Sequence, residues 1–513
     1  MSEIFAALSG LGDKFAAHVM LSASALALGI MVALPLAVWA ARSARVERVT
    51  LGFASLVQTV PALALLALFF PILLSLRAVF GEGLPTLGFL PALLALSLYA
   101  LLPILRNAVT AQANLEPGVI EAADGVGMTG WQRLRLVEAP LSAPYVMAGI
   151  RTAAVWTIGA ATLSTTIGQP GLGDPIFAGL QTQNWVLVLA GCIASAALAL
   201  IADGLLGMIE RGFRERRKGL WLTGGLLVSL GVLAAFVSQI DWRGEARETV
   251  VIGAKPFSEQ YILARLIGQR LEAEGYAVEY RDGLGSAVAH SAVASGAVDV
   301  MVDYTGTIWT NQMEKSEPVP SDEMLAEIET WEAENTGIAV LGRLGFENAY
   351  GLAVRRELAE QRGLASIADL AGQASGMTIG GDPEFFERPE WIAVRDAYGL
   401  RFADRRNFSP TFMYNALRSG EAQVIGAYTS DGRIAADNLV MLADPAGAFP
   451  NYDAIILLSR KAQSDAGLVA ALRPLVGAID VATMREANYA VDRADGGVSP
   501  DRAARDLSAR LSR

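Results

Sequence analysis

The sequence has few of the side chains that build disulfides and metal sites. Its 513 residues include one cysteine, Cys192, and two histidines, His18 and His290. A single thiol excludes an intrachain disulfide, and two histidines so far apart in sequence argue against a histidine-based metal site. We therefore expect no metal site, and we expect both histidines to be ordinary surface or core residues.

The chain also lacks the dipeptide on which a P-loop depends. No Gly-Lys pair occurs in it, so the GLGD at residues 171–174 is not a phosphate loop and the chain cannot bind ATP in that way. Its serines, acidic residues and two histidines form no arrangement typical of catalysis. The sequence thus predicts no catalytic residue, no enzyme activity and no cofactor bound by this chain.

Acidic residues are concentrated in one half of the chain. Up to Glu248 there are 16 Lys and Arg against 15 Asp and Glu, whereas the remainder has 25 against 37. Since 53% of all residues are hydrophobic and the mean hydropathy is +0.38, the chain combines a membrane body with a soluble body. The acidity of the second body argues against nucleic acid or an anionic membrane surface as its partner.

Long apolar runs occur only in the first half. A bilayer core of about 30 Å requires about 20 helical residues, and six runs reach that length. We expect spans near residues 17–41, 49–76, 87–111, 140–166, 185–209 and 219–240.

Basic residues predict the orientation of these spans. They cluster after the first run, around the segment between the third and fourth runs, and after the fifth run, whereas residues 152–210 contain none. By the positive-inside rule these three loops are cytoplasmic, and everything after residue 240 is outside. The N-terminus carries Glu3 and Asp13 without a basic region, so we do not expect a secretory signal there. We interpret the sixth run as an uncleaved signal anchor, and a cleaved signal peptide is the alternative.

Residues 116–140 form the only polar, charge-mixed segment between long apolar runs. Glu121, Ala122 and Ala123 suit a short helix whose small side chains allow another protein to approach closely, and Gly127 permits a sharp turn. The segment is typical of a docking helix, and an interfacial amphipathic helix is the alternative.

From Thr249 onward, short strand-like runs alternate with helical segments, which predicts an α/β fold. About 265 residues favour two lobes with a cleft between them. We expect helices to start at Ser258, Ser286 and Ser366. The predicted strands are VVIGA, VEYRD, VDVMVDY, IAVLG, GLAV, MTIGG, QVIGAY and AIILLS.

Polar and aromatic residues follow the ends of several of these strands. Tyr304, Tyr350, Tyr428 and Tyr452 occupy four such junctions, where they could hold a methylated ammonium group against their ring faces. For any one of them alone packing is the better explanation, and the four together favour the aromatic cage. Donors for a ligand carboxylate would come from Lys255, Gln260, Ser286 and Thr307. The alternative is that these residues have structural roles, as helix caps and turn formers. The remaining candidate ligand-binding residues are Asp303, Asn348 and Asp431.

Four stretches of the first half are distinctive: QTVPALALLAL, LPILRNAV, EAADGVGMTGWQRLRLVEAPLSAP and GIRTAAVWTIGAATLSTTIGQPGLGD. Five of the second half are GAKPFSEQ, GLGSA, DYTGT, GFENAYGLAV and FPNYDAI. The first set resembles the permease, and the second set the type II substrate-binding protein, of the quaternary-amine (glycine betaine, choline, carnitine) family of ABC importers. The resemblance implies an all-α transmembrane permease of the type I ABC importer kind, followed by an α/β two-lobed type II periplasmic-binding-protein domain. The expected domains are a permease at 1–212 with a coupling loop at 116–140, a sixth span and linker at 213–248, and a substrate-binding domain at 249–513.

The same resemblance implies a function and a set of partners. The chain would be the permease and receptor of an ATP-driven importer for a quaternary ammonium compound, in a bacterial inner membrane with its C-terminal domain in the periplasm. Its partners would be a cytoplasmic ABC ATPase dimer, which uses the ATP and contacts Glu121, Ala122, Ala123 and Gly127, and a second copy of this chain. The four tyrosines fall on the family's aromatic cage positions. A membrane-anchored amine sensor, a secondary transporter, and an importer of a different amine or amino-acid-like solute are the alternatives.

Overall fold

The computed structural model describes residues 2–81, 84–181, 184–240, 249–315, 319–382, 385–408, 410–493 and 497–511. The chain divides into two compact units, residues 1–177 with 186–245 and residues 178–185 with 246–513. We call them the helical unit and the α/β unit. Most of the expected linker, residues 241–248, lies outside the described residues.

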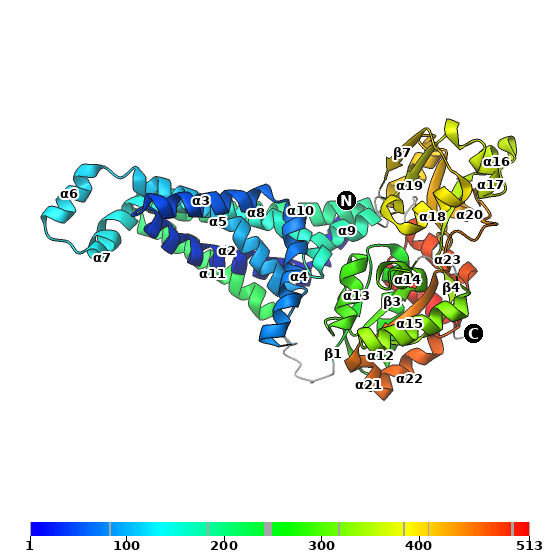
Figure 1. The fold of residues 1–513 in the computed structure, drawn as a ribbon. Helices are drawn as coiled ribbons and strands as arrows, with labels where there is room; N and C mark the ends of the chain where they lie inside the picture. Colours follow the sequence, from blue (N-terminus) through cyan, green and yellow to red (C-terminus); the bar gives the residue numbers. More distant parts are fainter. Residues whose placement is uncertain are drawn as a thin grey trace. The chain divides into compact units, whose positions relative to one another are not determined.

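The helical unit contains no strand among its described residues, and its long helices run side by side (Figure 1). Its elements are α1 (Ser2–Ser9), α2 (Gly12–Ala40), α3 (Ala44–Thr59), α4 (Ala62–Phe80), α5 (Phe89–Ala113), α6 (Pro117–Gly125), α7 (Gly130–Arg133), the π-helix η1 (Leu134–Glu138), α8 (Ala139–Ala161), the 3-10 helix η2 (Thr162–Ile167), α9 (Gly173–Gln181), α10 (Trp185–Arg214) and α11 (Lys218–Ser238).

Six helical segments of the described chain are long and apolar enough to span a membrane, as predicted. They are α2, α4, α5, the segment Gly130–Ile167, α10 and α11. The run expected at 49–76 is nevertheless wrong as one continuous helix, because α3 ends at Thr59 and α4 begins at Ala62. Pro61 explains the break: its ring disfavours helical backbone at the preceding residue, and Val60 is extended (φ −75°, ψ 126°).

Helix α5 lies at the centre of the helical unit, where it packs against α2, α3, α4 and α8. Glycines permit the close approach: a Cβ on Gly149 would lie 2.8 Å from Asn107 Cβ, and one on Gly29 would lie 3.0 Å from Ala100 Cβ. His18 is a buried core residue of α2. Its Nδ1 accepts from the Leu172 amide at 3.2 Å and its Nε2 lies 3.0 Å from the Ile158 carbonyl, which fits a neutral ring with its proton on Nε2.

The α/β unit alternates strands and helices, as the sequence predicts. Its strands are β1 (Thr249–Gly253), β2 (Ala277–Arg281), β3 (Val300–Tyr304), β4 (Ala339–Glu347), β5 (Tyr350–Arg355), β6 (Thr378–Gly381), β7 (Asp404–Asn407), β8 (Val424–Tyr428), β9 (Leu439–Met441) and β10 (Asp453–Leu458). Its helices are α12 (Ser258–Ala273), α13 (Ser286–Ala294), α14 (Thr305–Asn311), α15 (Ser321–Asn335), α16 (Arg356–Arg362), α17 (Ile367–Ala371), η3 (Ala374–Gly376), η4 (Phe385–Glu387), α18 (Pro389–Tyr398), α19 (Pro410–Ser419), α20 (Arg433–Ala436), α21 (Arg460–Ser464), α22 (Ala466–Leu472), η5 (Arg473–Leu475), α23 (Val481–Asp492) and α24 (Pro500–Leu511).

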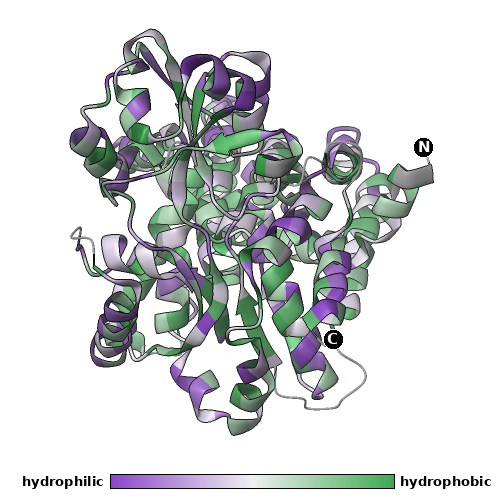
Figure 2. Ribbon diagram, turned by 90° about the vertical axis from the view of Figure 1, so that its right-hand side faces the viewer, coloured by the Kyte–Doolittle hydropathy of each residue, from purple (hydrophilic) through white to green (hydrophobic). Residues whose placement is uncertain are grey.

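These strands form two five-stranded sheets, so the predicted two-lobed α/β architecture is confirmed. The first lobe is built on the order β2-β1-β3-β10-β4 and the second on β7-β6-β8-β5-β9. The chain crosses between the lobes from β4 to β5 and returns from β9 to β10. In Figure 2 hydrophilic segments are concentrated on helices at the outside of this unit, which is the pattern of a water-soluble body.

All three expected helix starts are confirmed, because α12 and α13 begin at Ser258 and Ser286 and α17 follows Ser366, but only Ser366 caps its helix. Ser366 caps α17, where it accepts from the Asp369 amide while the Asp369 side chain accepts from the Ser366 amide. Ser258 and Ser286 are the first residues of α12 and α13 and make no capping hydrogen bond. The Ser258 hydroxyl instead donates to Asp492, because the two side chains meet in the interior of the unit.

Candidate functional site

A cavity of about 330 Å³ opens between the two lobes of the α/β unit. The first lobe contributes the segments after β1 and β3, the second lobe contributes those after β6 and β8, and both crossings take part. Its lining residues are Lys255, Pro256, Phe257, Ser258, Glu259, Gly285, Ser286, Tyr304, Thr307, Asn348, Tyr350, Asp382, Arg388, Tyr428, Ser430, Asp431, Arg433, Tyr452, Asn488 and Asp492.

Five aromatic side chains lie close together on the wall of this cavity, and we call them the aromatic cluster: Phe257, Tyr304, Tyr350, Tyr428 and Tyr452. The Tyr350 ring centroid is 4.8 Å from that of Tyr428 and 5.8 Å from that of Tyr452, with the latter pair edge to face. Phe257 is 6.3 Å from Tyr304 and 6.5 Å from Tyr428. Rings at such spacings can contact a single small ligand from several sides.

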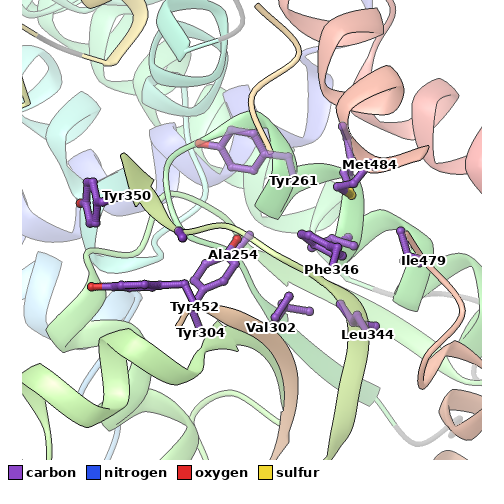
Figure 3. Packing of buried hydrophobic residues seen from close by; sticks show 14 of the residues in the cluster. Ala254, Tyr261, Val302, Tyr304, Leu344, Phe346, Tyr350, Tyr452, Ile479 and Met484 are labelled. Atoms are coloured by element: carbon purple, nitrogen blue, oxygen red, sulfur yellow. The ribbon is translucent and has the colours of Figure 1, made fainter. Parts of the chain in front are cut away.

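The aromatic cluster continues into the hydrophobic core. In Figure 3, Tyr304, Tyr350 and Tyr452 lie at one end of the cluster of buried residues, and Phe346 and Met484 lie toward the other. The site is therefore supported by packed side chains, which hold its rings in place.

The tyrosine hydroxyls are bonded to neighbouring side chains, which fixes the ring planes. The Tyr304 hydroxyl donates to Glu259 Oε1 at 2.6 Å and accepts from Gln260 Nε2 at 3.0 Å. The Tyr428 hydroxyl lies 3.1 Å from Asp382 Oδ2, and that of Tyr452 donates to Glu390. The rings are thus available to a ligand mainly through their apolar and π surfaces.

Glu259 connects several parts of the wall. Besides Tyr304, its carboxylate accepts from Asn348 Nδ2 at 3.1 Å and from Asn488 Nδ2 at 2.9 Å. Burial raises the pKa of the Glu259 carboxyl, and hydrogen bonds with Ser430, Tyr304 and Asn488 oppose the rise. Burial likewise raises the pKa of Asp492 to about 6, which the nearby Arg433 guanidinium counteracts.

Each of the three cationic groups on the wall has a carboxylate partner. Lys255 Nζ lies 2.6 Å from Asp303 Oδ1, and Arg433 lies 2.6 Å from Asp431. Arg388 lies 3.5 Å from Glu390, and its guanidinium carbon is 5.3 Å from the centre of the Tyr350 ring.

Carboxylates outnumber cations among the lining residues. Glu259, Asp382, Asp431 and Asp492 face three cationic side chains there. Four acidic groups together with five aromatic rings favour a ligand with a diffuse positive charge, since both the carboxylates and the ring faces attract cations.

Comparison with known proteins identifies the family. Residues 26–215 match the family described as binding-protein-dependent transport system inner membrane component. Residues 248–509 match the family described as substrate binding domain of ABC-type glycine betaine transport system. The chain belongs to this family of ABC transport systems. It carries permease and substrate-binding parts in one polypeptide, so it is a multi-pass membrane protein with a C-terminal binding domain.

Curated relatives of this ABC transporter chain have the same two parts or the permease alone. The ergothioneine transport permease/ergothioneine binding protein EgtU of Helicobacter pylori (strain G27) is 28% identical over 469 residues, which are 89% of this chain and 82% of the relative. The glycine betaine/carnitine/choline transport system permease protein OpuCB of Bacillus subtilis (strain 168) is 41% identical over 198 residues, which are 39% of this chain and 86% of the relative. The choline transport system permease protein OpuBB of the same organism is 39% identical over 194 residues, which are 38% of this chain and 84% of the relative.

Most of the predicted ligand-binding residues line the cavity of the ABC binding domain. All four tyrosines do, together with Lys255, Ser286, Thr307, Asn348 and Asp431. Gln260 and Asp303 do not: they are buried behind the wall, where Gln260 donates to Tyr304 and Asp303 pairs with Lys255. Neither residue contributes an atom to the cavity lining. Through these bonds they instead hold the lining residues Tyr304 and Lys255 in position.

Other lining residues were missed in the sequence. Phe257 lies inside the GAKPFSEQ stretch and could have been found there as an aromatic between two expected donors. Asp382 and Arg388 follow β6 in a segment that gave no ligand signal, and Asn488 and Asp492 belong to α23. No local pattern connects α23 to the cavity, because tertiary contacts place it there: α23 packs on α12 of the first lobe, and Asn488 donates to the Ser430 carbonyl of the second lobe.

The predicted coupling residues of this ABC permease lie on the exposed loop between α5 and α8. Helix α6 presents Glu121 and Ala122 to solvent and buries Ala123, and Gly127 has φ +80°. In Figure 1 α6 and α7 project beyond the ends of the long helices of the helical unit. Of this loop's other residues, Val126 is 74% exposed and Trp131 68%, so the loop offers apolar surface as well as charge.

Ion pairs and a cap stiffen this projecting loop. Arg133 donates to both Asp124 oxygens, at 2.7 and 2.9 Å, and to Glu138 Oε1 at 2.8 Å. Thr129 and Gln132 form a capping box at the start of α7. These contacts give the loop a defined shape, as a docking surface requires.

Proposed function

We propose that this chain is the permease and receptor of an ATP-driven importer whose substrate is a quaternary ammonium compound such as glycine betaine, choline or carnitine. The observation that carries the proposal is the aromatic cluster in a cavity with four carboxylates. A trimethylammonium group donates no conventional N–H hydrogen bond, so ring faces and nearby negative charge are what can hold it, at about 0.5 to 2 kcal/mol per ring.

The relatives support this substrate class. Their names specify glycine betaine, carnitine, choline and ergothioneine, and each of these compounds carries a trimethylammonium group. Apart from that group the compounds differ, since choline has a hydroxyl where the others have a carboxylate. The shared group is therefore the part for which we propose the aromatic cluster.

We further propose the arrangement of the complete transporter. The α6–α7 loop docks on a cytoplasmic ABC ATPase dimer through the exposed Glu121, Ala122 and Gly127, with the buried Ala123 beneath them, and two copies of this chain form the pathway. The binding domain faces the periplasm of a bacterial inner membrane, and ATP is used by the partner subunit. Attachment of the receptor to the permease would keep it at an effective concentration of the order of mM.

Calorimetry with the purified full chain in detergent tests the substrate class. Choline, glycine betaine, carnitine, proline betaine and ergothioneine are titrated, with dimethylglycine and an unmethylated amino acid as controls. We expect binding of at least one trimethylammonium compound and a clear loss when a methyl group is removed from it. Preference for the unmethylated amino acid would contradict the proposal and favour an amino-acid-type importer.

Uptake separates a transporter from a receptor that only signals. Proteoliposomes that contain this chain and a co-purified ATPase subunit should accumulate the calorimetric ligand only when ATP is supplied on the ATPase side. Binding without accumulation would favour the membrane-anchored sensor, and accumulation driven by an ion gradient without ATP would favour a secondary transporter.

A further inference from the structure

The helical unit has a pocket of about 560 Å³ of its own, formed where α10 ends, α11 begins and η1 leads into α8. Three cationic residues line it: Arg135 from η1, Arg216 from the connection between α10 and α11, and Lys218 from the start of α11. None of its lining residues is acidic. A pocket of this composition attracts an anion, and the function proposed above does not use it.

Nearby carboxylates are engaged by other cations. Glu210 pairs with Arg214 and lies 3.4 Å from Arg151, and Glu215 lies 3.4 Å from Arg217. Within the part of the chain that the structure describes, no carboxylate forms an ion pair with the three cations of the pocket. Their charge is therefore directed at solvent or at a ligand.

The rest of the pocket is apolar and firmly built. Phe213 and Trp221 stack with their ring centroids 5.7 Å apart and an interplanar angle of 9°. A Cβ on Gly212 would lie 2.6 Å from the Trp221 amide nitrogen, so α10 and α11 approach closely at this point. Leu141, at 39% exposure, adds an aliphatic wall.

The position of the pocket along the helices indicates what fills it. It lies at one end of three segments that are long and apolar enough to span a membrane, Gly130–Ile167, α10 and α11. Tryptophan and basic residues at the ends of membrane spans are found at the depth of lipid headgroups. An occupant at this depth meets cations on its polar side and rings and aliphatic side chains on its apolar side.

We propose that this pocket binds the headgroup of an anionic glycerophospholipid. The phosphate would lie among Arg135, Arg216 and Lys218, and an acyl chain would lie along Phe213, Trp221 and Leu141. This inference does not depend on which amine the binding domain takes. It requires only that the end of α10 and the start of α11, which form the pocket, lie at the headgroup level of a bilayer.

Native mass spectrometry of the full chain, purified without its ATPase, tests the proposal with phosphatidylglycerol and with phosphatidylcholine of the same acyl chains. We expect phosphatidylglycerol to be retained and phosphatidylcholine to be lost. Each basic residue near a membrane surface strengthens such binding about fivefold, so the triple variant R135Q/R216Q/K218Q should retain far less phosphatidylglycerol than the unchanged chain. Excess inorganic phosphate should not displace the lipid, because it has no acyl chain.

Two further variants separate a built site from general charge. R42Q/R45Q/R211Q removes three exposed cations outside the pocket and should leave phosphatidylglycerol bound, whereas A139W should fill the pocket and expel the lipid with all cations in place. Equal retention of both lipids, retention by the pocket variants, or an equal loss in R42Q/R45Q/R211Q would overturn the proposal. Displacement by inorganic phosphate would show an anion site without lipid selectivity, which also overturns it.

Discussion

Tyr350 and Tyr428 are opposite each other on the antiparallel strands β5 and β8, and their hydroxyl oxygens lie 3.1 Å apart. Side chains of directly paired residues lie on the same face of a sheet, so one register places both rings on the cavity wall. The 4.8 Å separation of their centroids is therefore a consequence of strand pairing in the second lobe.

This relationship leads to the first prediction, on the tyrosine side chains. Tyr→Ala at 304, 350, 428 or 452 should each weaken binding of a trimethylammonium ligand about two- to thirtyfold, which corresponds to about 0.5 to 2 kcal/mol per ring. Tyr→Phe should cost less because the ring face stays. Calorimetry on the full chain measures both, and indifference to all four alanine changes would eliminate the cage.

The second prediction concerns Phe257, the ring that sequence reasoning missed. Phe257→Leu should lower the affinity for the same ligand severalfold, since leucine keeps apolar volume but removes a π face. Phe402→Leu is the matched control, because Phe402 packs against Trp391, 6.2 Å away between centroids, and does not line the cavity. Equal losses of affinity in the two variants would show that the effect arises from general loosening of the domain.

The third prediction is a pH dependence of stability. Burial raises the pKa of Asp492 to about 6, above its ordinary 3.8, and raises the pKa of Glu259 in the same direction. In the window between about pH 4 and about pH 6 the folded chain binds more protons than the unfolded chain at these groups, so they make stability increase as the pH falls.

Asp492→Asn tests this sign. As the pH is lowered from about 7.5 to about 5, the Tm of the unchanged binding domain within the full chain should rise. The rise should be smaller in the variant, because the amide cannot ionise. At the upper pH the variant should be the more stable of the two. A Tm that falls over this range equally in both chains would be the contrary outcome.

The fourth prediction concerns coupling to the ATPase. Glu121→Lys reverses an exposed charge on α6, and Gly127→Val places a β-branched residue at φ +80°. Both should abolish ATP-dependent uptake and leave ligand affinity unchanged. Gly118→Ala is the control, since a Cβ there meets nothing within 4 Å and alanine suits a helix. Retained uptake in the first two variants would refute a coupling role.

The fifth prediction concerns topology. The exposed Cys192 is replaced by alanine, and single cysteines are then introduced at Arg216 and at an exposed position of the α/β unit, Glu357. An impermeant thiol reagent added from outside should label only the cysteine at 357, because the basic loops are expected to be cytoplasmic. Labelling at 216 from outside would invert the proposed orientation.

The sequence predicted those elements whose residues show a pattern on their own. The six spans and eight strands were found because continuous or clustered apolar residues mark them. The strand β7 was missed because its residues, DRRN, are all exposed and carry no apolar signal, and β9 was missed because it has three residues. Both are edge strands, β7 and β9 flanking the second sheet, and the sheet supplies the pairing that their side chains do not specify.

The candidate site was predictable to the same extent. The four tyrosines were found because they lie at the termini of strands. Tyr304 and Tyr428 are the last residues of β3 and β8, Tyr350 is the first residue of β5, and Tyr452 directly precedes β10. The balance of charge could not be predicted, because it depends on which groups meet in three dimensions: Lys255 with Asp303, and Ser258 with Asp492, which is 234 residues away. A serine at a helix start has the same local sequence whether it caps the helix or bonds to a distant carboxylate.

The two crossings between the lobes are joined to each other, since the Asn348 amide donates to the Tyr452 carbonyl at 2.9 Å. Both residues also line the cavity. If the lobes open by rotation about these joined crossings, the pivot of the rotation is therefore part of the cavity that would hold the ligand. Rotation about a pivot displaces nearby groups least and distant ones most. Release of the substrate would therefore begin at the outer rim of the cavity, and contacts with Asn348 and Tyr452 would be the last to break.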